Sequence, residues 1–340
     1  MKTLKIGLFG CGTVGSGVYA ILTEQRERIA GETGVDIEIA RVCVRDPLKQ
    51  RAVDLPPEIV TTDAAAIFDD PEIDVVIEVI GGERDALGII SRALVQGRNV
   101  VTANKDVIAK YLPQLRRLEE LHGGHLVYGA SVCGSVPILK IIDETLLTDR
   151  VGALRGVVNG STNFILTRLA DGWTWDEALS LAEANGFLEA DPSADLSGAD
   201  AARKLSILAF HAFGVHVLPE DIDTTGIEAI TAEDLERATA ARCTIKLVAE
   251  AILDDGEVRL SVAPRAVPLD SSLASVRDEV NIVEIDCDGI GTQRFTGKGA
   301  GSYPTANAVV SDLLDILARR RYRRWAAVIA ANEPGGVECV

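Results

Sequence analysis

The chain has 340 residues, of which 47% are hydrophobic and 25% are charged, as is typical of a soluble globular protein. This length can form two or three domains with buried cores. Acidic residues number 51 against 34 lysines and arginines, and the net charge of −17 argues against nucleic acid and anionic membranes as partners. No uncharged apolar run approaches the about 18 residues that a membrane span requires.

The six cysteines lie at positions 11, 43, 133, 243, 287 and 339 and form no Cys-x-x-Cys pair. This scatter favours free thiols in a reducing compartment over a disulfide framework or a zinc site, so we expect a cytoplasmic protein. Glycines interrupt the N-terminal apolar stretch before it could form a signal peptide. Five arginines between residues 319 and 324 are interpreted as the end of a helix rather than as a nucleic-acid patch.

The first third of the chain alternates between strand and helix patterns. Residues 4–9 form an apolar run that predicts a buried strand, the segment GCGTVG follows at 10–15, and a helical pattern extends over 13–28. Further strands are predicted at 37–44, 75–80 and 100–102. The alternation predicts an α/β domain of the Rossmann type, with a doubly wound parallel sheet, which we assign to residues 1–130.

The middle of the chain has a different character. Helices are predicted at 135–146, 175–185 and 199–214, and strands at 151–158, 257–263 and 280–287. Because these blocks do not alternate strictly, we expect an α+β domain over residues 131–304. A last helix at 305–320 follows the glycine-rich loop FTGKGAGSYPT.

The glycine loop is the first candidate site. In a dinucleotide-binding turn, Gly10 would allow the tight turn, Gly12 would let the backbone approach a pyrophosphate, and Gly15 would let the helix pack on the strand. Thr13 and Val14 open that helix, whose free N–H groups attract phosphate. The flanking strand and helix favour a bound dinucleotide over an ordinary turn.

The choice of cofactor depends on the end of the second strand, which reads Val44-Arg45-Asp46. Arg45 could pair with the 2′-phosphate of NADP, whereas the Asp46 carboxylate would repel it. A solvated ion pair between the two is an equally good interpretation. We favour NADP and leave NAD open.

Lysines and carboxylates form a second set of candidates. Lys105 follows a predicted strand whose end should face the cofactor, although an ordinary surface lysine fits as well. Asp200 and Lys204 lie four residues apart, on one face of a helix. Most such pairs are exposed salt bridges that contribute little to stability. Here the helix is largely apolar, and acidic side chains precede it, so the group could also bind an ammonium group and transfer a proton.

The order of the motifs resembles that of the homoserine dehydrogenases. The matching segments are GCGTVGSGV, VVIEVIGG, NVVTANK, VVNGSTNFIL, EADPSADLSGADAARKL and GKGAGSYPTANAVVSDLLDI, which together span nearly the whole chain. The resemblance implies interconversion of L-homoserine and L-aspartate 4-semialdehyde with NAD(P), in threonine and methionine biosynthesis. It also implies a homodimer, a substrate-binding and dimerisation role for the second domain, and a C-terminal helix, within 305–340, that returns to the first domain.

The resemblance also assigns roles to individual residues. Lys204 and Lys105 match the family's catalytic lysines, and which of them passes the proton stays open. The residues that match substrate-binding positions are Glu189, Asp195, Asp200, Asn159, Gly160, Ser161 and Thr162. Gly81 and Gly301 match positions that contact the cofactor.

One segment departs from the family pattern. Members commonly have a glutamate at the place of Gly129, which helps bind a monovalent cation together with carbonyl groups near Val132, Gly134 and Val136. Gly129 has no carboxylate, and Cys133 replaces a glycine, which restricts the backbone there. We therefore expect weak or absent dependence on sodium or potassium.

About fifteen residues follow the last predicted helix, and we do not expect an appended regulatory domain with threonine feedback. Two alternatives remain at this point. One is a related dehydrogenase of another small amino acid or semialdehyde, and the other is an inactive nucleotide-binding sensor. A sensor has no need of Lys105, Asp200 and Lys204.

Overall fold

The computed structural model describes residues 2–188, 191–318 and 322. These form two compact units. The first contains the residues up to Ser131 together with those from Gly301 onward, and the second extends from Val132 to Ala300.

The first unit is built on a six-stranded sheet in the order β3-β2-β1-β4-β5-β6. Its strands are β1 (Lys2–Phe9), β2 (Val35–Cys43), β3 (Val60–Thr61), β4 (Val75–Glu78), β5 (Asn99–Thr102) and β6 (Leu126–Val127). Every neighbouring pair is parallel. The strand order reverses between β1 and β4, and in such sheets ligands bind at the carboxyl ends beside that reversal. The expected doubly wound α/β fold is confirmed.

Helices flank this sheet. They are α1 (Thr13–Glu24), α2 (Arg26–Thr33), α3 (Ala65–Phe68), α4 (Arg84–Val95), α5 (Lys105–His122) and α13 (Ser302–Leu317), with short 3₁₀ turns η1 (Pro57–Ile59) and η2 (Gly129–Ser131). The prediction of one helix over 13–28 is wrong, because Gln25 leaves the helical conformation (φ −99°, ψ 9°). The new helix starts with Arg26, whose guanidinium pairs with Asp36 of β2.

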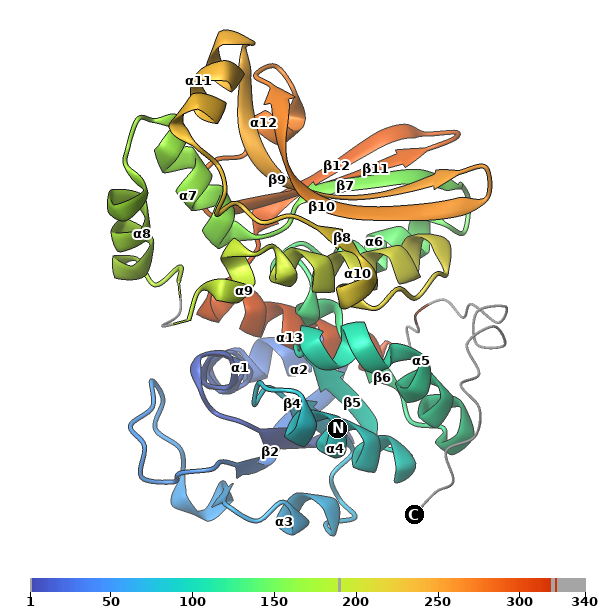
Figure 1. Ribbon diagram of the computed structural model, residues 1–340. Helices are drawn as coiled ribbons and strands as arrows, with labels where there is room; N and C mark the ends of the chain where they lie inside the picture. Colours follow the sequence, from blue (N-terminus) through green and yellow to red (C-terminus); the bar gives the residue numbers. More distant parts are fainter. Residues whose placement is uncertain (1, 189–190, 319–321, 323–340) are drawn as a thin grey trace. The chain divides into compact units, whose positions relative to one another are not determined.

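Helix α13 packs along α1, as Figure 1 shows. The two helices approach so closely that a Cβ on Gly17 would lie 2.7 Å from the Cβ of Ala306. Apolar residues of both helices, including Val18 and Val309, share one core with the central strands. The last helix is therefore an integral part of the nucleotide-type unit, although the sequence places it some 170 residues away.

The second unit contains a mixed sheet in the order β12-β11-β7-β9-β10-β8. Its strands are β7 (Val151–Val157), β8 (Asp223–Thr224), β9 (Cys243–Asp254), β10 (Glu257–Pro268), β11 (Val280–Cys287) and β12 (Gly291–Lys298). Three of these were not predicted from the sequence, and one of them, β8, has only two residues. β9 lies inside the sheet and most of it is buried, so it lacks the alternation that marks a strand, and β12 is a polar edge strand.

The helices of the second unit are α6 (Ile138–Thr145), α7 (Gly160–Ala170), α8 (Trp175–Ala184), α9 (Ser193–Leu196), α10 (Ala199–Phe213), α11 (Ala232–Ala240) and α12 (Ser272–Ser275), with the 3₁₀ turn η3 (Pro219–Asp221). Helix α10 packs against β7, β9 and β10 (Figure 1) and is buried along most of its length. The acidic segment that precedes α10 contains α9. None of the described helices combines the length and the apolar character that crossing a membrane would require.

Candidate active site

The glycine loop joins β1 to α1. Gly10 has a φ of +95°, and a Cβ there would lie 2.7 Å from the carbonyl oxygen of Val79. A Cβ on Gly15 would lie 2.2 Å from the carbonyl oxygen of Gly10, so both positions require glycine. Gly12 faces open space, which is where a ligand could approach the backbone. The loop thus has the shape that the sequence analysis expected of a dinucleotide-binding turn.

Two helix N-termini meet beside this loop. Helix α1 begins after Gly12 and α13 begins after Gly301, and neither has a side-chain cap. The Ser302 hydroxyl donates a hydrogen bond to the carbonyl oxygen of Thr13 (2.9 Å), which ties the two helix starts together. Uncapped N–H groups and the positive ends of helix dipoles favour an anion. The residues present therefore fit the pyrophosphate of a dinucleotide.

The loop after β2 contains Arg45 and Asp46, the side chains expected to determine the preference between NAD and NADP. Arg45 and Asp46 are both exposed, and no ion pair joins them in the described part of the chain. The Asp46 carboxylate instead accepts the backbone N–H of Leu48 (2.9 Å), and the Asp46 carbonyl accepts a hydrogen bond from Arg51 (2.5 Å). The Asp46 side chain is thereby held in its own turn.

The carboxyl ends of β4 and β5 carry Gly81 and Lys105. Gly81 and Gly82 both adopt positive φ, +71° and +75°. The Asn104 side chain donates to the Gly82 carbonyl (2.6 Å) and accepts the Val107 N–H (3.2 Å), which caps the start of α5. Lys105 is the first residue of that helix. The glycine turn and Lys105 are therefore brought to the same edge of the sheet.

Glu78 precedes this glycine turn and was not predicted from the sequence as a site residue. Its side chain is fully buried at the end of β4, and its carboxyl is hydrogen-bonded to Thr102 (2.5 Å). Burial raises the pKa of Glu78, while its hydrogen bonds act in the opposite direction. A carboxylate inside the otherwise apolar strand VVIE was the signal that could have drawn attention to it.

Asp200 and Lys204 form a buried ion pair at the start of α10. The Lys204 Nζ lies 2.7 Å from Asp200 Oδ2 and donates to the carbonyl oxygen of Val158 (2.8 Å). Only 8% of Lys204 and 3% of Asp200 is exposed, so the interpretation as an exposed salt bridge is wrong. The reason is that α10 is packed against the sheet of the second unit, which the spacing of two residues cannot reveal.

Asn159 connects this pair to a further carboxylate. Its amide nitrogen donates to Asp200 (2.8 Å) and to Asp195 of α9 (2.6 Å). Its amide oxygen accepts the N–H of Thr162 (2.8 Å) and so caps α7. The structure thus brings four of the residues that the resemblance implied, Asn159, Asp195, Asp200 and Lys204, into one polar cluster.

The rest of the expected substrate segment has local structural roles. A Cβ on Gly160 would lie 2.9 Å from the carbonyl oxygen of Glu279, so this position has no room for a side chain. The Ser161 hydroxyl donates to the Phe187 carbonyl (2.6 Å), which anchors the start of the acidic segment. Glu189 and the five predicted helix-end arginines lie outside the described residues.

Cys133 lies close to the Lys204–Asp200 pair. Burial raises the pKa of its thiol to about 11, and the charges of Lys204 and Asp200 also act on it, so the thiol is protonated at neutral pH. Its φ of +57° is unusual for a residue with a Cβ and costs on the order of 1 kcal/mol. The expected restriction of the backbone at this position is present.

The surroundings of Gly129 leave no room for the glutamate of the cation site that the family resemblance implies. A Cβ on Gly129 would lie only 2.5 Å from the Asp312 carboxylate, which is buried and accepts the Ala130 N–H (2.9 Å). The carbonyl of Val136 already accepts the N–H of Ile138 (2.7 Å). The described residues also contain no group of three or more His, Cys, Asp or Glu side chains that could hold a metal.

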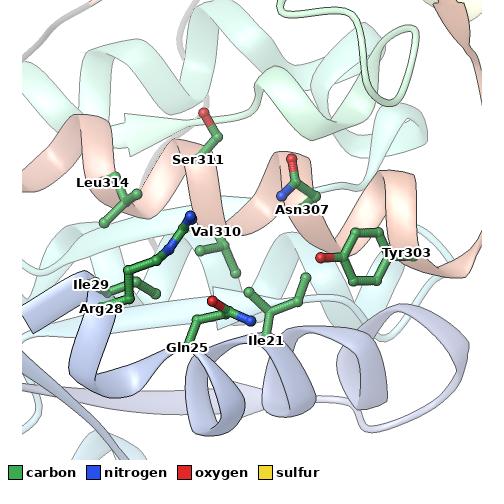
Figure 2. A pocket seen from close by; sticks show the side chains of 9 residues that line it. All are labelled: Ile21, Gln25, Arg28, Ile29, Tyr303, Asn307, Val310, Ser311 and Leu314. Atoms are coloured by element: carbon green, nitrogen blue, oxygen red, sulfur yellow. The ribbon is translucent and has the colours of Figure 1, made fainter.

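A cavity of about 260 Å³ lies between α1, α2 and α13 of the first unit (Figure 2). Arg28 is the charged side chain on its wall, Tyr303 lies at one end, and Ile21 and Val310 are among the apolar residues that line it. None of the site residues predicted from the sequence lines it.

Comparison with known proteins decides which family has this arrangement. A family model described as the NAD-binding domain of homoserine dehydrogenase matches residues 10–129, and the homoserine dehydrogenase model matches residues 137–314. A homoserine dehydrogenase of Bacillus subtilis is 41% identical over 322 residues, which are 94% of this chain and 74% of that protein. This chain belongs to the homoserine dehydrogenase family.

Solved homoserine dehydrogenase structures have the same fold. The enzyme from Thiobacillus denitrificans superposes with a TM-score of 0.90 at 37% identity, covering 98% of this chain and 76% of that one. A hyperthermophilic archaeal homoserine dehydrogenase in complex with NADPH gives a TM-score of 0.80 at 26% identity, covering 94% of this chain and 100% of that one.

The predicted function is confirmed: this homoserine dehydrogenase is an NAD(P)-dependent oxidoreductase that acts on a CH–OH group. The alternatives, a dehydrogenase of another amino acid and an inactive sensor, are not favoured.

Proposed function

We propose that the polar cluster of Lys204, Asp200, Asn159 and Asp195 is the site where L-homoserine or L-aspartate 4-semialdehyde is bound and where a proton is transferred. The observation that carries this proposal is the buried ion pair at the start of α10, with its 2.7 Å separation. A buried ion pair contributes little to stability, because the cost of desolvating the charges offsets their attraction. A role of the two charges in the reaction explains why the pair is present.

The acidic side chains would bind the ammonium group of the substrate. Asp200 and Asp195 both accept hydrogen bonds from Asn159, which orients the two carboxylates, and we assign the same task to Glu189. Asn159 is itself held by its cap on α7, so the carboxylates are oriented before the substrate arrives. Such preorganisation lowers the cost of binding.

Lysine side chains would handle the proton. An ammonium group has three N–H donors, and Val158 and Asp200 take two of those on Lys204, which leaves one for the oxygen of the substrate. During reduction of the aldehyde this donor would stabilise the developing alkoxide and give it a proton. We assign this step to Lys204 or to Lys105, whose backbone is fixed by the cap of α5.

The cofactor would bind at the carboxyl edge of the first sheet. When bound, the nicotinamide ring supplies or accepts the hydride. We assign its pyrophosphate to the loop of Gly10, Gly12 and Gly15 with the helix starts at Thr13, Val14 and Gly301, and its nicotinamide end to Gly81 and Lys105. Arg45 supports a preference for NADP, because it is exposed and is not paired with Asp46.

The finer properties of the enzyme are also proposals. We expect a homodimer assembled through the second unit, as the family resemblance implies, and a cytoplasmic location, as the scattered cysteines indicate. We expect no strong activation by sodium or potassium, because Asp312 fills the space beside Gly129.

Substrate discrimination tests the proposed ammonium site. L-Homoserine is compared with 4-hydroxybutanoate, which lacks the ammonium group, in the wild-type protein and in Asp195→Asn. The substitution should reduce the preference for homoserine, measured as the ratio of kcat/KM values, by about tenfold, the effect of losing about 1.4 kcal/mol. Asp191→Asn is the matched control, since Asp191 is exposed and, among the described residues, its carboxylate is hydrogen-bonded to the neighbouring Ser193. Equal ratios in all three proteins would refute the assignment.

A further inference from the structure

Glu78 is a buried acid without a cationic partner. It is 0% exposed, and no ion pair reaches it in the described part of the chain. Glu119, a second buried acid of the same unit, instead pairs with Arg116 (2.7 Å) and His125 (2.6 Å). Because burying an unpaired carboxyl is costly, other interactions must satisfy Glu78.

Hydrogen-bond donors take the place of a cation. One carboxyl oxygen accepts the N–H of Ile80 (2.8 Å), and the other is bonded to the Thr102 hydroxyl (2.5 Å). The Gly81 N–H and the Asn104 side chain also interact with the carboxyl group. These donors come from two turns that follow neighbouring strands, because Glu78 and Thr102 are register partners in β4 and β5.

The same hydrogen bonds close a ring that joins the two turns. Thr102 Oγ1 accepts the N–H of Asn104 (3.0 Å) while it is bonded to Glu78. The Asn104 side chain in turn donates to the carbonyl of Gly82 (2.6 Å). One turn contains the two glycines with positive φ, and the other leads directly into Lys105. The buried carboxyl is the shared acceptor of this ring.

We propose that Glu78 is a positioning residue that fixes the Gly81–Gly82 turn relative to Lys105, and thereby aligns the nicotinamide end of the cofactor site for hydride transfer. This inference rests on the proposed roles of Gly81 and Lys105. Glu78 itself is buried beneath the turn and acts through its neighbours. Hydride transfer is sensitive to such placement, since an error of about 1 Å can cost on the order of a hundredfold in rate.

The substitution Glu78→Gln tests this role with little change of shape. The N–H groups of Ile80 and Gly81 and the NH₂ of Asn104 can only donate to the carboxyl. An amide NH₂ in place of the oxygen bonded to Thr102 would reverse that hydrogen bond, so the Thr102 hydroxyl could no longer donate to position 78 and the ring would be rearranged. We expect kcat to fall about tenfold or more. The affinity for ADP, or for its 2′-phosphorylated form, should change by less than about twofold, because these fragments occupy the glycine-loop end of the site.

Glu119→Gln is the matched control, with the same substitution at a buried acid on the other end of α5. Loss of its ion pairs should lower the Tm and leave kcat within about twofold of the wild type. Glu78→Gln with wild-type kcat, or with kcat and ADP affinity falling in parallel, would overturn the proposal.

A second pair of variants covers the case in which Glu78→Gln does not fold. Thr102→Val removes the hydroxyl that joins Glu78 to Asn104, and Thr102→Ser keeps it. The valine variant should reproduce the loss of kcat, and the serine variant should recover most of it. Equal kcat values in the two would refute the role of the ring. Lys105→Ala tests the proposed site independently of Glu78. Wild-type turnover in that variant would refute the role of Lys105 in the site, and with it the site that Glu78 is proposed to align.

Discussion

The Lys204 ammonium lies 2.7 Å from the Asp200 carboxylate, one helical turn away on α10, and both side chains are almost fully buried. Coulomb attraction is stronger in such surroundings than at a surface, but the cost of desolvating the charges offsets most of it. Stability therefore does not explain the pair well. A function explains it better, in which one N–H group of Lys204 donates a hydrogen bond to an oxygen of the substrate.

Lys204→Ala should lower kcat by about a hundredfold or more, the usual contribution of a general acid, with a near-normal Kd for NADPH. The variant should also be less stable, by about 3–5 kcal/mol, because Asp200 keeps a buried charge without its partner. Steady-state kinetics, NADPH fluorescence and urea unfolding measure these three effects.

Lys246→Ala provides the control for this experiment. Lys246 is a buried lysine of the same unit that donates to Asn163 and to the Val276 carbonyl, and it is not among the proposed site residues. Its replacement should destabilise the protein but leave kcat nearly unchanged. Turnover of Lys204→Ala at the wild-type rate would remove Lys204 from the mechanism.

The stability of the protein should depend on pH through Lys246. Burial is the main reason why the pKa of Lys246 falls from its ordinary 10.5 to about 8, with the Arg277 charge acting in the same direction. Between these two values the folded protein binds fewer protons than the unfolded chain, so stability rises with pH there, by up to about 3 kcal/mol in total. Below pH 8 the lysine is charged in both states and this gain is absent.

Urea unfolding of the wild type and of Lys246→Met at pH 7.5 and pH 9.5 checks this prediction. Other groups titrate in the same interval, so the quantity of interest is the difference between the two proteins. The wild type should gain free energy of unfolding relative to the variant as the pH rises. A constant difference would show that Lys246 does not titrate in this range.

Arg45 should decide the preference between the two cofactors. Arg45→Ala removes a guanidinium that could pair with the 2′-phosphate of NADP, and it should raise the KM for NADP about tenfold, as expected for about 1.4 kcal/mol, while the KM for NAD stays nearly constant. Lys49→Ala tests whether any positive charge of this loop has the same effect. An equal change in both KM values would show that Arg45 does not recognise the 2′-phosphate.

Monovalent cations should have little effect on activity. The Asp312 carboxylate occupies the space that a side chain at position 129 would need, so the family's cation-binding glutamate has no counterpart at that position. The kcat should agree within about twofold in sodium, potassium and choline chloride at equal ionic strength. Strong activation by one of the two metal ions would contradict this prediction.

Local patterns in the sequence were enough for the glycine loop and for the four longer strands of the first sheet, but not for the two-residue strands β3 and β6. A short apolar run, glycines with a fixed spacing and a helical pattern are all properties of neighbouring residues, and β1, Gly10 and α1 follow from them. The four-residue spacing likewise placed Asp200 and Lys204 on one helix face. The family resemblance then assigned roles to residues whose function the local patterns left open.

Tertiary structure alone decided which of these groups are buried and which ones meet. Strand β9 was missed because most of it is buried. The four-residue spacing of Asp200 and Lys204 left open whether the pair is exposed or buried, because helix spacing carries no information on what packs against that helix face. Glu78 and Thr102 are 24 residues apart and become hydrogen-bonded only because β4 and β5 are neighbours in register. Burial and strand order arise from the packing of distant segments, and they determine whether a charged side chain is a solvated surface group or part of a site.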